Sequence, residues 1–114
     1  MSEIAFEDKM RIAVQEIQKW GLEYANYRPL ADHLDELKKT ILSSEILKYA
    51  EEAAWKAEAK ARTSEAYLVH LDGLKVAHER ANMAWAKLEA AKAKFDALRS
   101  LLSYEKKQME TFKE

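Results

Sequence analysis

Residues 64–112 read SEAYLVHLDGLKVAHERANMAWAKLEAAKAKFDALRSLLSYEKKQMETF, a run with one glycine and no proline. Apolar side chains recur in it every seven residues without a polar interruption, which is typical of a long helix that packs along a coiled-coil-like seam. A companion line lies three residues further on and is mostly alanine, so a partner helix can approach closely. We expect this seam to consist of Tyr67, Leu74, Ala81, Leu88, Phe95, Leu102 and Met109, with Ala77, Ala84, Ala91 and Leu98 as companions.

The first half of the chain supplies a partner helix of similar length. Its apolar residues are spaced alternately by four and three as far as Tyr27, and the spacing resumes at Leu30 after an extra step of three. This change of phase coincides with Pro29, whose ring removes a backbone donor and disfavours helical angles in the residue before it. We therefore predict a first helical arm over about 3–60, with a kink or break at 28–29.

A turn is predicted between the two arms at about 61–64. Thr63 or Ser64 can cap the amino terminus of a helix, and Glu65 adds negative charge to its first turn. The second arm then covers about 64–112, and residues 1–114 form a single all-α domain, a long antiparallel helical hairpin with a kinked first arm. Because a lone hairpin leaves large apolar side chains exposed, we expect two copies to dimerise into a four-helix bundle or coiled coil.

The composition agrees with this architecture and excludes several others. With 114 residues the chain has room for one ordinary domain, and 2 glycines and 1 proline are too few for the turns of an all-β fold. The absence of cysteine excludes disulfides, thiolate metal sites and thiol nucleophiles. No apolar run approaches the roughly 18 residues of a membrane span, and the start Met1-Ser2-Glu3 is unlike a signal peptide. We expect a cytoplasmic protein that does not contact membranes.

Basic residues of the second arm lie on both flanks of the seam, where coiled coils place interhelical ion pairs. A reversal near residue 62 sets Arg80 opposite Glu45 and brings Lys87 near Asp35, so we favour pairing between the arms over phosphate binding. The alternative is weak binding of single-stranded nucleic acid. The residues that would make these contacts are Arg80, Trp85, Lys87, Lys92, Lys94 and Arg99.

The three histidines are the obvious candidates for metal ligation or acid–base chemistry, since they titrate near neutral pH. His70 and His78 lie about 80° apart around a helix, and His33 lies among acids without a Glu-x-x-His arrangement. The sequence also contains no glycine-rich phosphate loop, nucleophile elbow or H-E-x-x-H motif. We therefore predict no enzymatic activity, no metal and no cofactor.

Several short motifs resemble one group of proteins. The second arm contains Ser64-Glu65-x-Tyr67, His70-Leu71-x-Gly73-Leu74 and Phe95 followed by Arg99-Ser100-Leu101, and the first contains Leu34-Asp35-Glu36-Leu37. Over residues 30–110 the chain resembles short, all-helical, largely uncharacterised proteins that tailed bacteriophages and prophages encode. Such proteins often accompany replication and recombination genes, so the resemblance implies an accessory protein in the cytoplasm of a bacterial host, near single-stranded DNA or a recombinase. It assigns no catalytic residue.

Together these observations predict a non-enzymatic helical interaction protein of phage type. We expect a homo-oligomer, most simply a dimer, and a further protein partner that binds a helical face. Single-stranded nucleic-acid binding is one alternative, and a structural or assembly coiled coil is the other. A structural coiled coil needs only a helix and an apolar face, and so does an interaction protein, so the sequence does not distinguish these two.

Overall fold

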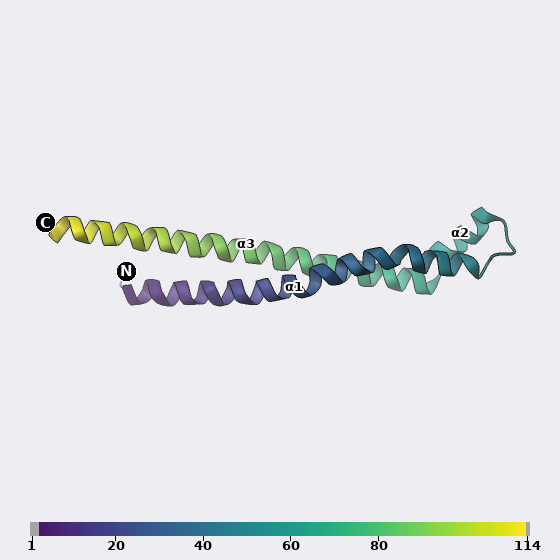
Figure 1. The fold of residues 1–114 in the computed structure, drawn as a ribbon, viewed down its shortest axis with the longest axis horizontal. Coiled ribbons are helices and arrows are strands. Elements are labelled where there is room, and N and C mark those ends of the chain that lie inside the picture. Colours follow the sequence, from purple (N-terminus) through teal and green to yellow (C-terminus); the bar gives the residue numbers. More distant parts are fainter. Residues whose placement is uncertain (1–2, 114) are drawn as a thin grey trace. The chain divides into compact units, whose positions relative to one another are not determined.

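A computed structural model describes residues 3–113, which form three helices (Figure 1). They are α1 (Glu3–Leu47), α2 (Ala54–Arg62) and α3 (Glu65–Lys113). These residues include no strand, and the prediction of an all-α protein is confirmed. None of the helices is long and apolar enough to cross a membrane, over the part of the chain that the structure describes.

The first helix does not break at residues 28–29. Pro29 lies inside α1, which is helical on both sides of it. Because proline has no N–H, the carbonyl of Ala25 loses its helical partner, but Ala25, Asn26 and Pro29 are all exposed and water can hydrate that oxygen. Of the two alternatives for this position, the break is therefore excluded.

The chain reverses at residues 48–53, earlier than the predicted turn at 61–64. The first arm thus ends at Leu47 and not near residue 60, and α2 already belongs to the return path (Figure 1). Thr63 and Ser64 separate α2 from α3, where the Oγ of Ser64 accepts a hydrogen bond from the N–H of Tyr67 at 3.3 Å. The predicted serine cap is present, but it marks a local interruption and not the reversal.

The reversal at 48–53 contains neither glycine nor proline, which is why the sequence did not reveal it. The chain leaves α1 through short-range backbone bonds, from the N–H of Lys48 to the carbonyl of Glu45 and from that of Tyr49 to that of Ile46. Ala53 is the N-cap of α2 and offers no side-chain cap. Lys60 then pairs with the carboxylate of Glu52 and lies 5.4 Å from the ring centroid of Tyr49, so side chains of α2 hold the turn.

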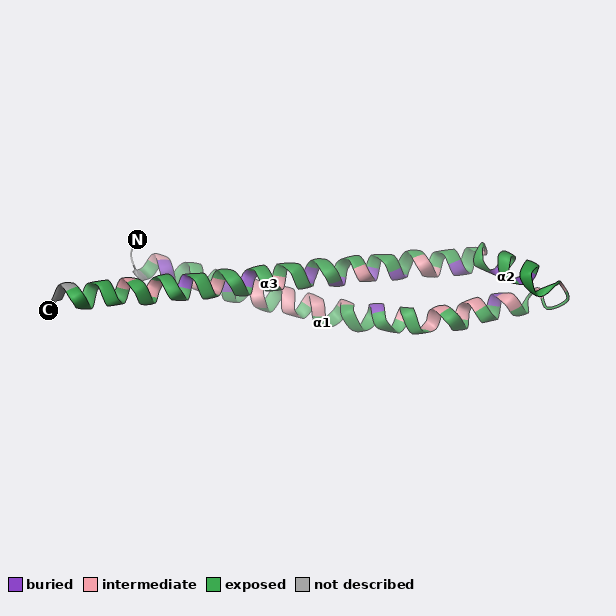
Figure 2. Ribbon diagram, turned by 90° about the horizontal axis from the view of Figure 1, so that it is seen from above, coloured by how far each residue is buried: buried purple, intermediate pink, exposed green. Residues whose placement is uncertain are grey.

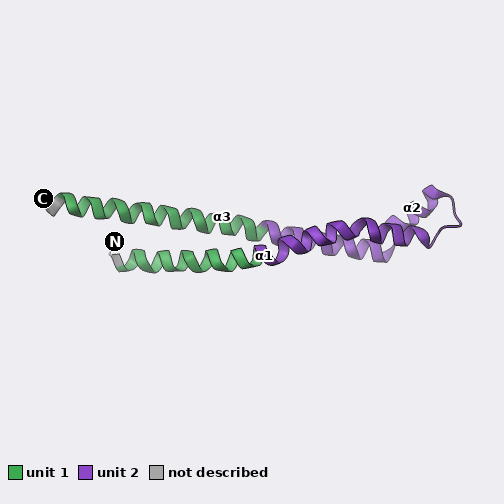
Figure 3. Cartoon of the chain, in the orientation of Figure 1, with its two compact units in different colours: residues 1–23, 83–114 green, residues 24–82 purple. Residues whose placement is uncertain are grey.

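Contacts divide the chain into two compact units (Figure 3). Unit 1 comprises residues 1–23 and 83–114, and unit 2 comprises residues 24–82. Each unit pairs a part of α1 with a part of α3 in antiparallel orientation, and unit 2 also contains the reversal and α2.

The core of unit 1 is built by aromatic and aliphatic residues from both helices. Phe6, Ala13 and Leu98 are buried together, and Met10, Phe95 and Leu102 pack against them. Toward the amino terminus of α3, Ala84 and Ala91 are also buried. Figure 2 colours the buried positions along the helices purple. A methyl group on Gly21 would lie 3.9 Å from the Cδ1 of Leu88, so the two helices approach closely there.

The core of unit 2 is thinner. Its buried hydrophobic residues are Ala31, Ala57, Ala61, Tyr67, Leu74, Ala77 and Ala81. Glu45 is also buried, and its carboxylate is paired with the Nζ of Lys48 at 3.0 Å. At the carboxyl end of α2, Arg62 donates two hydrogen bonds to Glu58, and these bonds and the charge of Glu58 raise the pKa of Arg62.

The seven seam positions of α3 differ in their burial. Tyr67, Leu74 and Ala81 are buried within the chain, and Leu88, Phe95 and Leu102 are half-buried. Met109 is 62% exposed, so the expectation that it belongs to a seam does not hold within the chain. The reason is that the last turns of α3 extend past the start of α1, where no facing helix covers them (Figure 1).

Candidate functional site

Two of the three histidines link the helices of unit 2. His70 donates from Nε2 to the carbonyl of Leu34 at 2.7 Å, and the Nε2 of His78 lies 3.0 Å from the Oδ2 of Asp35. His33 is exposed on α1. Among the described residues no group of three or more histidine, cysteine or acidic side chains is placed to hold a metal ion. The geometry thus gives His70 and His78 a structural role.

The basic residues of α3 do not meet the acids that the predicted register assigned to them. Arg80 donates to the hydroxyl of Tyr27 and lies 5.2 Å from its ring centroid, instead of pairing with Glu45. The Nζ of Lys87 lies 4.7 Å from the ring centroid of Trp20 on α1. The cause is the earlier reversal, which shifts every residue of α3 toward the amino terminus of α1. The predicted ion pairs between the arms are therefore wrong.

The residues of the nucleic-acid alternative are divided between the two units. Arg80 belongs to unit 2 and the other five to unit 1. Lys92 pairs with Glu89 at 3.4 Å and Arg99 with Asp96 at 3.5 Å, both within α3. Trp85 is 52% exposed and lies on the same flank as these two, whereas Lys87 and Lys94 lie on the other flank.

Lys87 and Lys94 instead join residues of α1 around an open groove of unit 1, which we call the Trp20 groove. Its volume is about 430 Å³. The ring centroid of Trp20 lies 4.7 Å from the Nζ of Lys19 and 4.7 Å from that of Lys87, so two ammonium groups are close to one indole. The groove is lined by Glu16, Lys19, Trp20, Lys87, Ala90, Ala91 and Lys94.

The Trp20 groove is electropositive. Three lysines line it against one acid, and within residues 3–113 the structure shows no ion pair for Lys19, Lys87 or Lys94. For the two lysines of α3 the cause is visible in the sequence, because only alanine, methionine and leucine occur three and four residues away from them. An anion is the ligand that such a group of cations attracts.

Sequence reasoning missed Lys19 altogether and did not assign Trp20 to a site. The signal for Lys87 and Lys94 was present, since neither has an acid one helical turn away. The signal for Lys19 and Trp20 was not, because only the register of α1 against α3 brings them to the same groove. That register depends on the reversal at 48–53.

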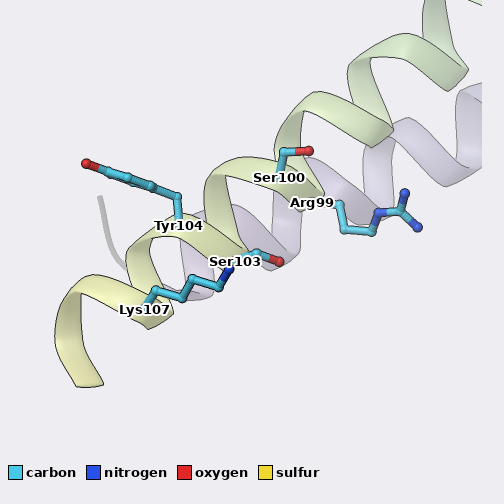
Figure 4. Close-up of a pocket in the computed structure, with 5 residues that line it drawn as sticks. All are labelled: Arg99, Ser100, Ser103, Tyr104 and Lys107. Atoms are coloured by element: carbon cyan, nitrogen blue, oxygen red, sulfur yellow. The ribbon is translucent and has the colours of Figure 1, made fainter. Parts of the chain in front are cut away.

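A second depression, of about 350 Å³, lies near the carboxyl end of α3 (Figure 4). All five residues that line it come from this one helix: Arg99, Ser100, Ser103, Tyr104 and Lys107. Figure 4 shows that the side chains of Arg99 and Tyr104 point in opposite directions, and the Tyr104 hydroxyl accepts a hydrogen bond from Gln108 at 2.9 Å. The groups do not converge on a point where a ligand could be held.

No protein-family model, curated protein or solved structure matches this chain. The resemblance to phage-encoded helical proteins therefore stays a prediction.

Proposed function

We propose that this chain is a non-enzymatic helical interaction protein that associates with a second copy of itself through apolar side chains on the outer faces of its helices. The distribution of apolar residues carries the proposal. Among the described residues, eight of the twelve buried hydrophobic residues are alanine. Fifteen large hydrophobic residues are at least 38% exposed.

The energetic consequence follows from the size of alanine. Burying a large apolar side chain stabilises a fold by about 1.5–3 kcal/mol, whereas a methyl group contributes about 0.8 kcal/mol. Ordering each residue costs roughly 1–2 kcal/mol of backbone entropy. An alanine seam lets two helices approach closely but contributes little burial for the residues it orders. Covering the outer apolar residues supplies the missing burial.

Exposed apolar residues on the surface of unit 2 support the proposal. Val69 and Val76 lie seven residues apart on α3 and are 62% and 47% exposed, although the neighbouring positions Tyr67 and Leu74 are buried against the rest of the unit. Leu68, beside Val69, is 46% exposed. Seven residues are close to two helical turns, so the valines form a second apolar line along α3.

The predicted seam residues themselves do not serve this purpose. Leu88 and Phe95 are half-buried within unit 1, where Phe95 packs on its hydrophobic core. A polar substitution there would disrupt the pairing of α1 with α3 in one chain. The outer positions Val69 and Val76 are the appropriate test of association.

Sedimentation equilibrium of the full chain tests the proposal. We expect the wild type to sediment as a dimer or larger species and the V69K/V76K variant to sediment as a monomer with unchanged helical content. The matched control is N26K/N82K, which adds two charges at exposed polar positions of the same unit and should keep the wild-type mass. A monomeric wild type at every concentration would contradict the proposal, and so would equal masses of wild type and V69K/V76K.

The resemblance to phage proteins provides the setting that we propose for this activity. In that setting the chain acts in the cytoplasm of a bacterial host as an accessory to replication or recombination, and the apolar face also receives a partner protein. The support for this setting is the set of motifs in residues 30–110.

A further inference from the structure

We propose that the Trp20 groove binds single-stranded nucleic acid, with a base stacked on Trp20 and the neighbouring phosphates neutralised by Lys19, Lys87 and Lys94. This inference is independent of self-association. It uses residues of unit 1 that the association surface of unit 2 does not include.

The first argument is the absence of ion pairs for the three lysines among the described residues. Elsewhere on α1 and α3 many basic side chains lie beside an acid one turn away, as in the pairs Arg11–Asp8, Arg28–Asp32, Lys38–Asp35, Lys75–Glu79, Lys92–Glu89 and Arg99–Asp96. Lys87 and Lys94 have no acid three or four residues away, and Lys19 forms no ion pair in the described residues although Glu16 and Glu23 lie at those spacings. Like charges brought together repel each other. A phosphate backbone relieves this repulsion and releases its own counterions on binding.

The second argument is the position of the indole. Trp20 is half-buried in the groove, and the ammonium groups of Lys19 and Lys87 each lie 4.7 Å from its ring centroid. A cation over an aromatic ring at a site open to solvent contributes less to binding than a base stacked on the same ring. A base therefore displaces a lysine from the ring, and the displaced ammonium group is released beside the phosphate.

The third argument selects a single strand over a duplex. The faces of the bases are covered in a duplex, so Trp20 can stack only on an unpaired base. The three lysines of the Trp20 groove lie in a chain whose net charge is -1, and they do not form the broad basic surface of a duplex-binding protein. Lys87 and Lys94 are about 10 Å apart along α3, so the two ammonium groups can contact different phosphates of one strand.

Fluorescence measurements on the full chain test the inference. In the W55F/W85F background Trp20 is the only indole, and both replaced residues are exposed. We expect a labelled oligothymidylate at low salt to gain anisotropy and to quench Trp20. For three cations the logarithm of the binding constant should fall with the logarithm of salt concentration with a slope of about -2.

Charge reversal locates the site. The variant K87E/K94E should bind at least tenfold more weakly, whereas the matched control K75E/K107E changes the same total charge at exposed positions of the same helix and should bind as the background protein does. Sedimentation of both variants should give the wild-type mass, so loss of nucleic-acid binding is separable from loss of association.

Four results would overturn the inference. The first two are no binding of the oligothymidylate at low salt and equal weakening by both double variants. The other two are binding without quenching of Trp20 and equal affinity for inorganic polyphosphate, since either would identify a general polyanion site in which the base has no part.

Discussion

Gly73 lies inside α3 at a position where an added methyl group would meet no atom within 4 Å. Glycine in a helix interior costs roughly 0.5–1 kcal/mol relative to alanine, because it loses more backbone entropy on folding. We expect G73A to raise the free energy of unfolding by that amount. Thermal unfolding followed by circular dichroism measures it, with G21A as a second case whose methyl group makes an ordinary 3.9 Å contact with Leu88. A lower melting temperature for G73A would show that the helix is not continuous there.

Pro29 is the second residue at which the backbone of a helix is weakened. It is exposed within α1, so removing its ring opens no cavity and restores the hydrogen bond to the carbonyl of Ala25. We expect P29A to stabilise the protein by about 3 kcal/mol, the cost of proline relative to alanine in a helix interior. Urea denaturation measures the change. If P29A lost stability, α1 would not be a continuous helix in the folded protein.

Among the helices, the close contact of α1 and α3 in unit 1 depends on small residues. Ala84 is 1% exposed, and a larger side chain there has no free volume. We expect A84L to destabilise the fold by about 1–3 kcal/mol through overpacking. The matched control is A86L, an identical change two residues away on the exposed side of α3. Similar unfolding midpoints for the two variants would place Ala84 outside the contact.

The helices differ in how far the sequence could predict them. For α3 the signal is direct, since a seven-residue apolar repeat and the cap at Ser64 are both local features. The end of α1 at Leu47 has no such signal, because Ala53 is an uncapped N-cap and Lys48 to Glu52 contain no helix breaker. The turn forms there through contacts such as Lys60 with Glu52, which exist only once the chain has reversed.

The missing signal for the reversal also explains why the sequence did not predict the Trp20 groove. Lys87 and Lys94 were predicted as cations of one flank, but their surroundings depend on which part of α1 lies opposite. Because the reversal was predicted at 61–64, Arg80 was assigned to Glu45 and Lys87 to Asp35. The position of Lys87 beside Trp20 therefore could not be predicted.

For the whole molecule, the register of α1 against α3 is the central claim, because the core, the outer apolar line and the Trp20 groove all follow from it. The chain contains no cysteine, so pairs of introduced thiols report it without background. In the structure Arg80 donates to Tyr27, and Glu45 lies about 27 Å further along α1. The pairs Y27C/R80C and E45C/R80C thus share one position and differ only in the partner.

The decisive measurement is a cross-linking experiment in dilute solution. Each variant is treated with a short bismaleimide whose length is close to the distance that the two replaced side chains span. Intrachain products are identified by mass spectrometry of proteolytic peptides. We expect an intrachain cross-link in Y27C/R80C and none in E45C/R80C. Cross-linking of E45C/R80C in place of Y27C/R80C would contradict the account and would return the reversal to residues 61–64.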